Sequence, residues 1–209
     1  SEDAWWVWWN AYSYANSQPT SMTPDGKYVL FVSYADNLGP VDLNGQMDIF
    51  LKDTTNGAIE KASVSRLWVE SNGYSYTNWG TALSDDGRFI LFMSYADNLV
   101  EQDTNGQADV FVRDRVNNTT NIISATWFDQ WGGYGNFSWW YFVPGNGEST
   151  PRAITPDGRY VLFYSSATDL VTGSDTNNER DVFVHDTATH TTTRASTDSS
   201  GNEANAYSS

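Results

Sequence analysis

The sequence contains no cysteine, only two histidines and few basic residues, and each scarcity excludes a class of chemistry. Without cysteine the chain has no disulfides, no thiol catalysis and no thiolate metal ligands. No metalloprotease histidine pair, nucleophile elbow or phosphate-binding loop is present, so the common catalytic motifs are missing. Acidic residues outnumber basic ones by 26 to 11, giving a formal net charge of −15. This balance disfavours nucleic acids and anionic membranes as partners and suits a bound cation.

Long apolar runs are missing as well. No run approaches the roughly 18 residues of a transmembrane helix, so we expect no membrane span. Aromatic residues are abundant instead, with 10 Trp, 12 Tyr and 10 Phe among stretches rich in Ser, Thr, Asn and Gly. Together with the scarcity of lysine, this composition predicts an extracellular or cell-surface location.

Three segments repeat one pattern, at residues 22–38, 83–99 and 154–170. Each contains a turn of the type Pro-Asp-Gly or Asp-Asp-Gly and then a nearly continuous apolar run. Proline presets φ and glycine accepts a positive φ, which makes this a strong turn sequence. The equivalent residues Asp25 and Asp86 are 61 residues apart, and Asp86 and Asp157 are 71 apart.

Each repeat predicts four short antiparallel strands. In the first repeat we expect strands at residues 20–23, 28–33, 49–52 and 58–64, the second of them buried on both faces. The fourth strands of the other repeats are expected at 121–125 and 191–196. No segment shows sustained helical periodicity. The predicted fold is therefore all-β, with three four-stranded blades of the β-propeller type.

The repeat also carries a family resemblance. The motif Pro-Asp-Gly-(Lys/Arg)-Tyr-Val-Leu-Phe, followed by Asp-(Val/Ile)-Phe-(Val/Leu)-x-Asp, resembles the WD40-like PD40 repeat of TolB-type β-propellers. Residues 103–114 are similar to the bacterial surface or extracellular variety with Asp-Thr-Asn-Gly loops. The resemblance covers about three quarters of the chain. It implies a propeller fold and no particular activity.

We divide the chain into three blades and the segments between them. The blades are expected at residues 20–66, 81–126 and 151–197, separated by an aromatic linker at 67–80 and an aromatic insertion at 127–150. Residues 1–19 and 198–209 are expected to be linker or assembly segments.

Three blades are too few to close a propeller, which usually needs about 4–8 of them. Asn-Ala-Tyr-Ser occurs at residues 10–13 and again at 205–208, so the chain is expected to begin and end inside an inter-blade linker. We therefore expect copies of the chain to continue head to tail as a ring or a filament, or the chain to be a segment of a longer array.

Each repeat contains an Asp-x-Asn-(Gly/Asn)-x-x-Asp loop, whose oxygen atoms suit calcium. The loop ligands would be Asp42, Asn44 and Asp48, then Asp103, Asn105 and Asp109, then Asp175, Asn177 and Asp181. A preceding acid, Asp36, Asp97 or Asp169, would add to each site. The alternative is a hairpin turn in which the Asp side chains cap backbone amides. The sequence leaves both interpretations open.

Aromatic side chains concentrate outside the blades. The tryptophans concerned are Trp5, Trp6, Trp8, Trp9, Trp68, Trp79, Trp127, Trp131, Trp139 and Trp140. Exposed in water, such a cluster would be costly, so we expect the rings to pack between blades or between copies of the chain. Stacking on sugar rings is the alternative, with glycans as partners.

Two functional hypotheses follow. The first is an extracellular structural protein that assembles with copies of itself and is stiffened by calcium. The second is a propeller lectin that binds carbohydrate through its aromatic loops. An enzyme is not expected, because most acids occupy repeated positions and His185 aligns with Lys52 and Arg113 at what we expect to be a surface position.

Overall fold

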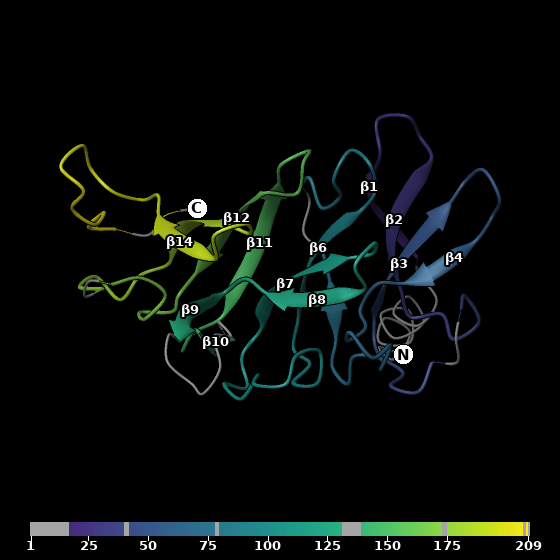
Figure 1. The fold of residues 1–209 in the computed structure, drawn as a ribbon, viewed down its shortest axis with the longest axis horizontal. Helices are drawn as coiled ribbons and strands as arrows, with labels where there is room; N and C mark the ends of the chain where they lie inside the picture. Colours follow the sequence, from purple (N-terminus) through teal and green to yellow (C-terminus); the bar gives the residue numbers. More distant parts are fainter. Residues whose placement is uncertain are drawn as a thin grey trace, which may run out of the picture.

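The computed structural model describes residues 17–39, 42–77, 80–130, 139–172, 175–206 and 208. Figure 1 shows three twisted sheets that follow one another along the long axis of the molecule in sequence order, from purple to yellow. Within the described residues there is no helix of the length and apolarity that a membrane span requires.

Each sheet is a four-stranded antiparallel meander of strands consecutive within the blade. Blade 1 contains β1 (Gln18–Met22), β2 (Tyr28–Ser33), β3 (Asp48–Asp53) and β4 (Ile59–Lys61). Blade 2 contains β5 (Ser75–Tyr76), β6 (Phe89–Ser94), β7 (Asp109–Asp114) and β8 (Thr119–Ile122). Blade 3 contains β11 (Ser149–Ile154), β12 (Tyr160–Ser165), β13 (Asp181–Asp186) and β14 (Thr191–Arg194). This strand order confirms the predicted fold class, and none of the three sheets is closed on itself.

The turn before the second strand has the predicted chemistry in all three blades. Asp25 illustrates it: its Oδ1 accepts hydrogen bonds from Thr23 Oγ1 at 2.7 Å and from the Lys27 amide at 2.9 Å. Gly26 follows with φ 71°, and its equivalents Gly87 and Gly158 have φ 71° and 75°. The turn therefore depends on a capping aspartate and a glycine in the left-handed region.

The aromatic insertion departs from the sequence interpretation. We expected a loop-like segment, whereas β9 (Ala125–Gln130) and β10 (Trp139–Pro144) pair as an antiparallel hairpin. Aromatic and β-branched residues favour strands, and here they face one another across the pair. Trp127 packs on Phe142 with ring centroids 5.2 Å apart, and Phe128 stacks on Tyr141 at 4.8 Å.

Each blade has two faces, which we call forward and rear. The forward face packs on the next blade, and residues directly opposite each other on paired strands share a face. In blade 1 the forward face is Leu30, Val32, Ile49 and Leu51, all buried. These side chains form one core with the rear face of blade 2, which includes Ile90, Phe92 and Phe111.

The second junction repeats the first. The forward face of blade 2 is Leu91, Met93, Val110 and Val112, again buried. Three of these, Leu91, Val110 and Val112, share a core with Val161, Phe163 and Phe183 on the rear face of blade 3. Blade 2 is therefore covered on both sides, whereas blades 1 and 3 are each covered by a neighbouring blade on one side. The predicted burial of β2 on both faces is met only in part, because Val29 and Phe31 on its rear face are half-buried.

A ring-on-glycine contact marks both junctions. A Cβ added to Gly87 would overlap the ring of Tyr28, and one added to Gly158 would overlap the ring of Phe89. We therefore expect Gly87→Ala to destabilise the fold through both backbone strain and overlap with Tyr28, by about 2–4 kcal/mol. Gly106→Ala is the control, because Gly106 has φ 65° with nothing within 4 Å of its Cβ position. Urea unfolding of the two variants measures the difference, and equal losses would contradict this account.

Candidate functional site

The last aspartate of each predicted loop opens the third strand of its blade and is almost completely buried. Asp48, Asp109 and Asp181 are 1%, 0% and 1% exposed. Each accepts a hydrogen bond from a serine near the end of the fourth strand: Ser63 to Asp48 at 2.6 Å, Ser124 to Asp109 at 2.6 Å, and Ser196 to Asp181 at 2.7 Å. The Asp–Ser pair thus joins the third strand to the fourth in every blade.

The loop asparagines also bond to the protein. The side-chain amides of Asn44, Asn105 and Asn177 donate to backbone carbonyls of the following linker, at 2.6, 2.8 and 2.6 Å. Their side-chain oxygens accept backbone amides two residues ahead, as in Asx turns. Asp42 and Asp175 likewise cap two backbone amides each. This is the hairpin chemistry that the sequence offered as the alternative to calcium.

In blade 1 the structure adds two residues that the sequence analysis missed. Asp42, Asp48 and Glu70 each offer a carboxylate oxygen within 4.8 Å of the others. Lys61 lies among them, with its Nζ 2.8 Å from Asp48 Oδ2 and in contact with Glu70. Burial raises the pKa of Asp48, although the Lys61 ammonium acts in the opposite direction. The acidic cluster therefore contains its own cation.

Blade 3 has the same arrangement. Asp175, Asp181 and Glu203 form the carboxylate group, again within 4.8 Å. Arg194 is 3.2 Å from Asp181 and 2.5 Å from Glu203. Arg194 pairs with Phe183 as Lys61 pairs with Phe50, so the two cations occupy equivalent positions. Aligning the fourth strands and linkers of the repeats would have revealed both the basic residue and the glutamate.

Blade 2 differs at both of these positions. Ile122 pairs with Phe111 and so replaces the cation, and Pro144, which precedes the carbonyl bound by Asn105, replaces the glutamate. Asp103 and Asp109 are 7% and 0% exposed. Burial raises the pKa of Asp103 to about 6 and that of Asp109 to about 7. Within the described residues, blade 2 thus buries two carboxylates without the basic side chain of the other blades.

The three preceding acids lie at the surface. Asp36, Asp97 and Asp169 are exposed. Asp97 accepts a hydrogen bond from Asn72 at 2.6 Å, and Asp169 accepts one from the Asn146 amide at 2.9 Å. Both of these aspartates still act electrostatically on blade 2, because Asp97 helps to raise the pKa of Asp103 and Asp169 that of Asp109.

The prediction that His185 lies at the surface is wrong. His185 is 0% and its equivalent Arg113 1% exposed, because both belong to rear faces that the preceding blade covers. His185 Nδ1 lies 2.9 Å from Thr192 Oγ1, and burial lowers the pKa of His185 to about 4. The imidazole is therefore neutral at physiological pH and packs in the junction between blades 2 and 3.

Two of the predicted tryptophans stack on the next blade. Trp68 lies over the Arg113 guanidinium at 4.8 Å, and Trp127 stacks on His190 at 4.4 Å. Trp139 and Trp140 belong to β10, but their side chains lie outside the described part of the structure. Trp5, Trp6, Trp8, Trp9, Trp79 and Trp131 also lie outside the described residues.

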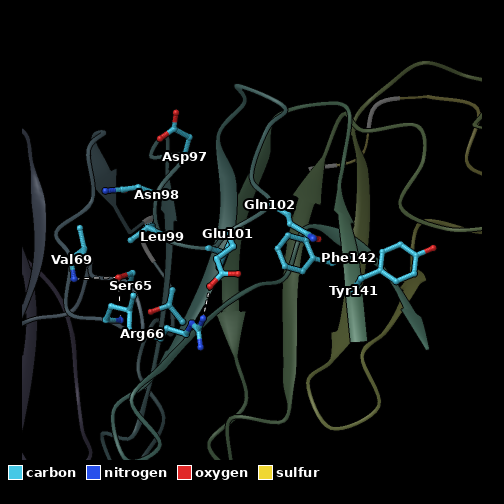
Figure 2. Close-up of a pocket in the computed structure, with 13 residues that line it drawn as sticks. Ser65, Arg66, Val69, Asp97, Asn98, Leu99, Glu101, Gln102, Tyr141 and Phe142 are labelled. Atoms are coloured by element: carbon cyan, nitrogen blue, oxygen red, sulfur yellow. Dashed lines mark hydrogen bonds and ion pairs between the residues drawn. The ribbon is translucent and has the colours of Figure 1, made fainter. Parts of the chain in front are cut away.

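A groove of about 650 Å³ lies between the first linker, the loop after β6 and the hairpin. Figure 2 shows Arg66 and Glu101 joined by an ion pair on one wall, with Phe142 and Tyr141 further along. Tyr141 is 39% exposed and stacks on Phe128. The groove thus combines exposed polar groups with aromatic rings.

The internal cation of blade 1 gives a direct stability prediction. Lys61→Ile copies the residue of blade 2 and leaves Asp48 and Glu70 without their cation, so we expect a loss of about 3–5 kcal/mol. Lys61→Arg, which copies blade 3, should retain most of the stability. Breaking the exposed pair by Arg66→Ala should cost less than about 1 kcal/mol. Chemical denaturation at about pH 7.5, where surface carboxylates are ionised and lysine is protonated, measures all three. Similar losses for Lys61→Ile and Arg66→Ala would contradict the assignment.

No family model matches the chain, and no curated protein matches it. Among solved structures, TolB from Acinetobacter baumannii is 18% identical, with a TM-score of 0.46 over 90% of this chain and 34% of that one. The putative TolB from Agrobacterium tumefaciens is also 18% identical, with a TM-score of 0.46 over 87% of this chain and 50% of that one. The β-propeller domain of the Trilobed protease from Pyrococcus furiosus is 11% identical, with a TM-score of 0.33 over 87% of this chain and 56% of that one.

The chain thus spans between a third and roughly half of the length of these structures. These structures are two TolB proteins and a domain of a protease, and at such identities no function is carried over from them to this chain. The consecutive four-stranded antiparallel blades are those that the PD40 motif implied. In its fold the chain is an all-β repeat protein of three consecutive four-stranded antiparallel blades.

Proposed function

We propose that the chain is a self-assembling structural protein whose copies join head to tail. In this arrangement the forward face of blade 3 packs on the rear face of blade 1 in the next copy. The observation that carries the proposal is the difference between the forward face of blade 3 and those of the other two blades.

The forward face of blade 3 consists of Leu162, Tyr164, Val182 and Val184. All four are half-buried, whereas every equivalent residue in blades 1 and 2 is buried beneath the next blade. Fully burying an exposed side chain of this kind stabilises a structure by about 1.5–3 kcal/mol, and covering a half-buried one contributes part of that. Four adjacent apolar side chains at a junction surface therefore favour a partner that resembles a fourth blade.

The rear face of blade 1 has the same pair of rings as the rear faces of blades 2 and 3, with Phe31 half-buried and Phe50 2% exposed. Phe31 and Phe50 stack there at 5.7 Å, as Phe92 and Phe111 do at 5.7 Å in blade 2 and Phe163 and Phe183 at 5.5 Å in blade 3. The last two pairs receive a forward face in this structure. A second copy can present an equivalent forward face to the first pair.

The two surfaces differ from each other, so the interface is heterologous. Such an interface forms a closed ring where the rotation between copies closes and a filament where it does not. Two copies would supply six blades, which is within the usual range of about 4–8 for closed propellers. Both outcomes use the same contact.

Val184→Asp should prevent assembly, because it buries a carboxylate in the apolar junction. Val116→Asp is the matched control, since Val116 is 72% exposed in the turn between β7 and β8. Sedimentation velocity should show Val116→Asp assembling like the unaltered chain and Val184→Asp as single folded copies. Equal assembly of the two variants would contradict the proposed interface.

Calcium is the second part of the proposal, and the side chains around each loop support one location for it. Blades 1 and 3 each already hold one basic side chain, Lys61 or Arg194, among their three carboxylates. Asp103 and Asp109 of blade 2 have no such partner among the described residues, and hard oxygen ligands suit calcium. We therefore propose a calcium site in blade 2 rather than in all three loops.

Calcium should raise the unfolding temperature at pH 8, where both blade 2 carboxylates are ionised. At 100 times its dissociation constant a ligand stabilises the folded state by about 2.7 kcal/mol. Asp103→Asn should abolish the shift, and Asp42→Asn in the equivalent loop of blade 1 should retain it. Differential scanning fluorimetry with calcium or EDTA measures both variants. An unaltered chain that shows no shift would overturn the calcium site and leave the head-to-tail interface untouched.

Carbohydrate binding stays a hypothesis with less support. Trp68 and Trp127 stack on neighbouring blades, which favours packing over sugar recognition. The groove beside Tyr141 is the surface that would carry it. We propose no enzymatic role, because the clustered acids recur from blade to blade and bond to serine, lysine or arginine. The extracellular location also stays a prediction.

A further inference from the structure

The first residue of the second strand is an aromatic knob in every blade. Tyr28, Phe89 and Tyr160 occupy this position in blades 1, 2 and 3. The basic residue before each ring covers part of it, with Lys27, Arg88 and Arg159 at 4.9, 4.5 and 5.0 Å from the ring centroids. The knob is therefore held in a repeated orientation by its own blade.

At both internal junctions this ring lies against a glycine of the next blade. Tyr28 contacts Gly87 so closely that an added Cβ would overlap the ring, and Phe89 contacts Gly158 in the same way. Each glycine is the third residue of the turn before the second strand. Its missing side chain creates the socket, and its positive φ gives the turn its shape.

One knob and one socket have no counterpart within the described chain. Tyr160, the third ring of the series, is 39% exposed. Gly26 is the first glycine of the series, with φ 71° and nothing within 4 Å of its Cβ position. Its turn already has the shape of the occupied sockets, because Asp25 accepts the same pair of hydrogen bonds as Asp157.

We propose that Tyr160 of one copy inserts against Gly26 of the next copy and sets the register of the assembly. This inference rests on the proposed head-to-tail function and names the contact that aligns it. A shift by one residue along the turn would place the side chain of Asp25 or Lys27 where the internal junctions have a glycine, Gly87 or Gly158, against the ring. The contact therefore selects one alignment among those that the apolar faces alone would allow.

Four variants test the contact by sedimentation equilibrium. Tyr160→Ala removes the knob and Gly26→Ala fills the socket, and each should weaken association by about tenfold or more, the equivalent of about 1.4 kcal/mol. Tyr160→Phe should associate like the unaltered chain, because Phe89 fills the position in blade 2. Gly106→Ala should also associate normally, since it imposes similar backbone strain away from both outer faces.

Mixing the two weakened variants gives the sharpest result. Copies carrying Gly26→Ala retain Tyr160, and copies carrying Tyr160→Ala retain Gly26, so one unaltered junction forms between them. We expect a one-to-one pair that grows no further.

The outcomes separate this inference from the proposed function. A monomeric unaltered chain would overturn the function itself. An unaltered chain that assembles while Tyr160→Ala and Gly26→Ala assemble equally well would overturn the knob-and-socket contact and leave the function standing. Failure of the mixed variants to pair, when each alone is weakened, would also overturn it. Circular dichroism of each variant confirms that the fold is retained.

Discussion

The structure depends on the pairing of a forward face with a rear face. A four-stranded blade has apolar side chains on both faces, and a neighbouring sheet is what removes them from water. Blade 2 has a neighbouring blade on both faces, and its β6 and β7 are buried almost throughout. Blades 1 and 3 each have one apolar face without a described blade on it. The forward face of blade 3 is half-buried, and on the rear face of blade 1 Phe31 is half-buried and Phe50 is 2% exposed. The proposed assembly follows from this constraint.

The buried aspartates at the start of the third strands hold each blade together. In every blade a serine near the end of the fourth strand donates a hydrogen bond to the aspartate that opens the third strand, which is Asp48, Asp109 or Asp181. This hydrogen bond offsets part of the cost of burying the carboxylate. In the outer blades a basic residue and a glutamate complete the group. In blade 2 isoleucine and proline replace both together, so the loss of the cation accompanies the loss of its acidic partner. A bound cation is proposed in blade 2 alone because Asp103 and Asp109 have no basic side chain beside them among the described residues.

The sequence predicted the repeats and the strands well, because turn chemistry and apolar runs are local signals. β2 (Tyr28–Ser33) begins and ends where expected. The hairpin of β9 and β10 was not predicted from the sequence, because the glycine and asparagine residues among its aromatic residues suggested a loop. The burial of His185 was missed because it depends on the preceding blade. Lys61 and Glu70 were missed because neither lies in the loop motif, and chain pairing alone brings them to Asp48.

Electron microscopy of the unaltered chain under assembling conditions tests the central claim most directly. The account predicts that the blade spacing and rotation across the boundary between two copies equal those between blades 1 and 2 and between blades 2 and 3. The map should then show an uninterrupted series of blades, closed as a ring or extended as a filament. Isolated three-blade particles, or copies joined through any other surface, would contradict it.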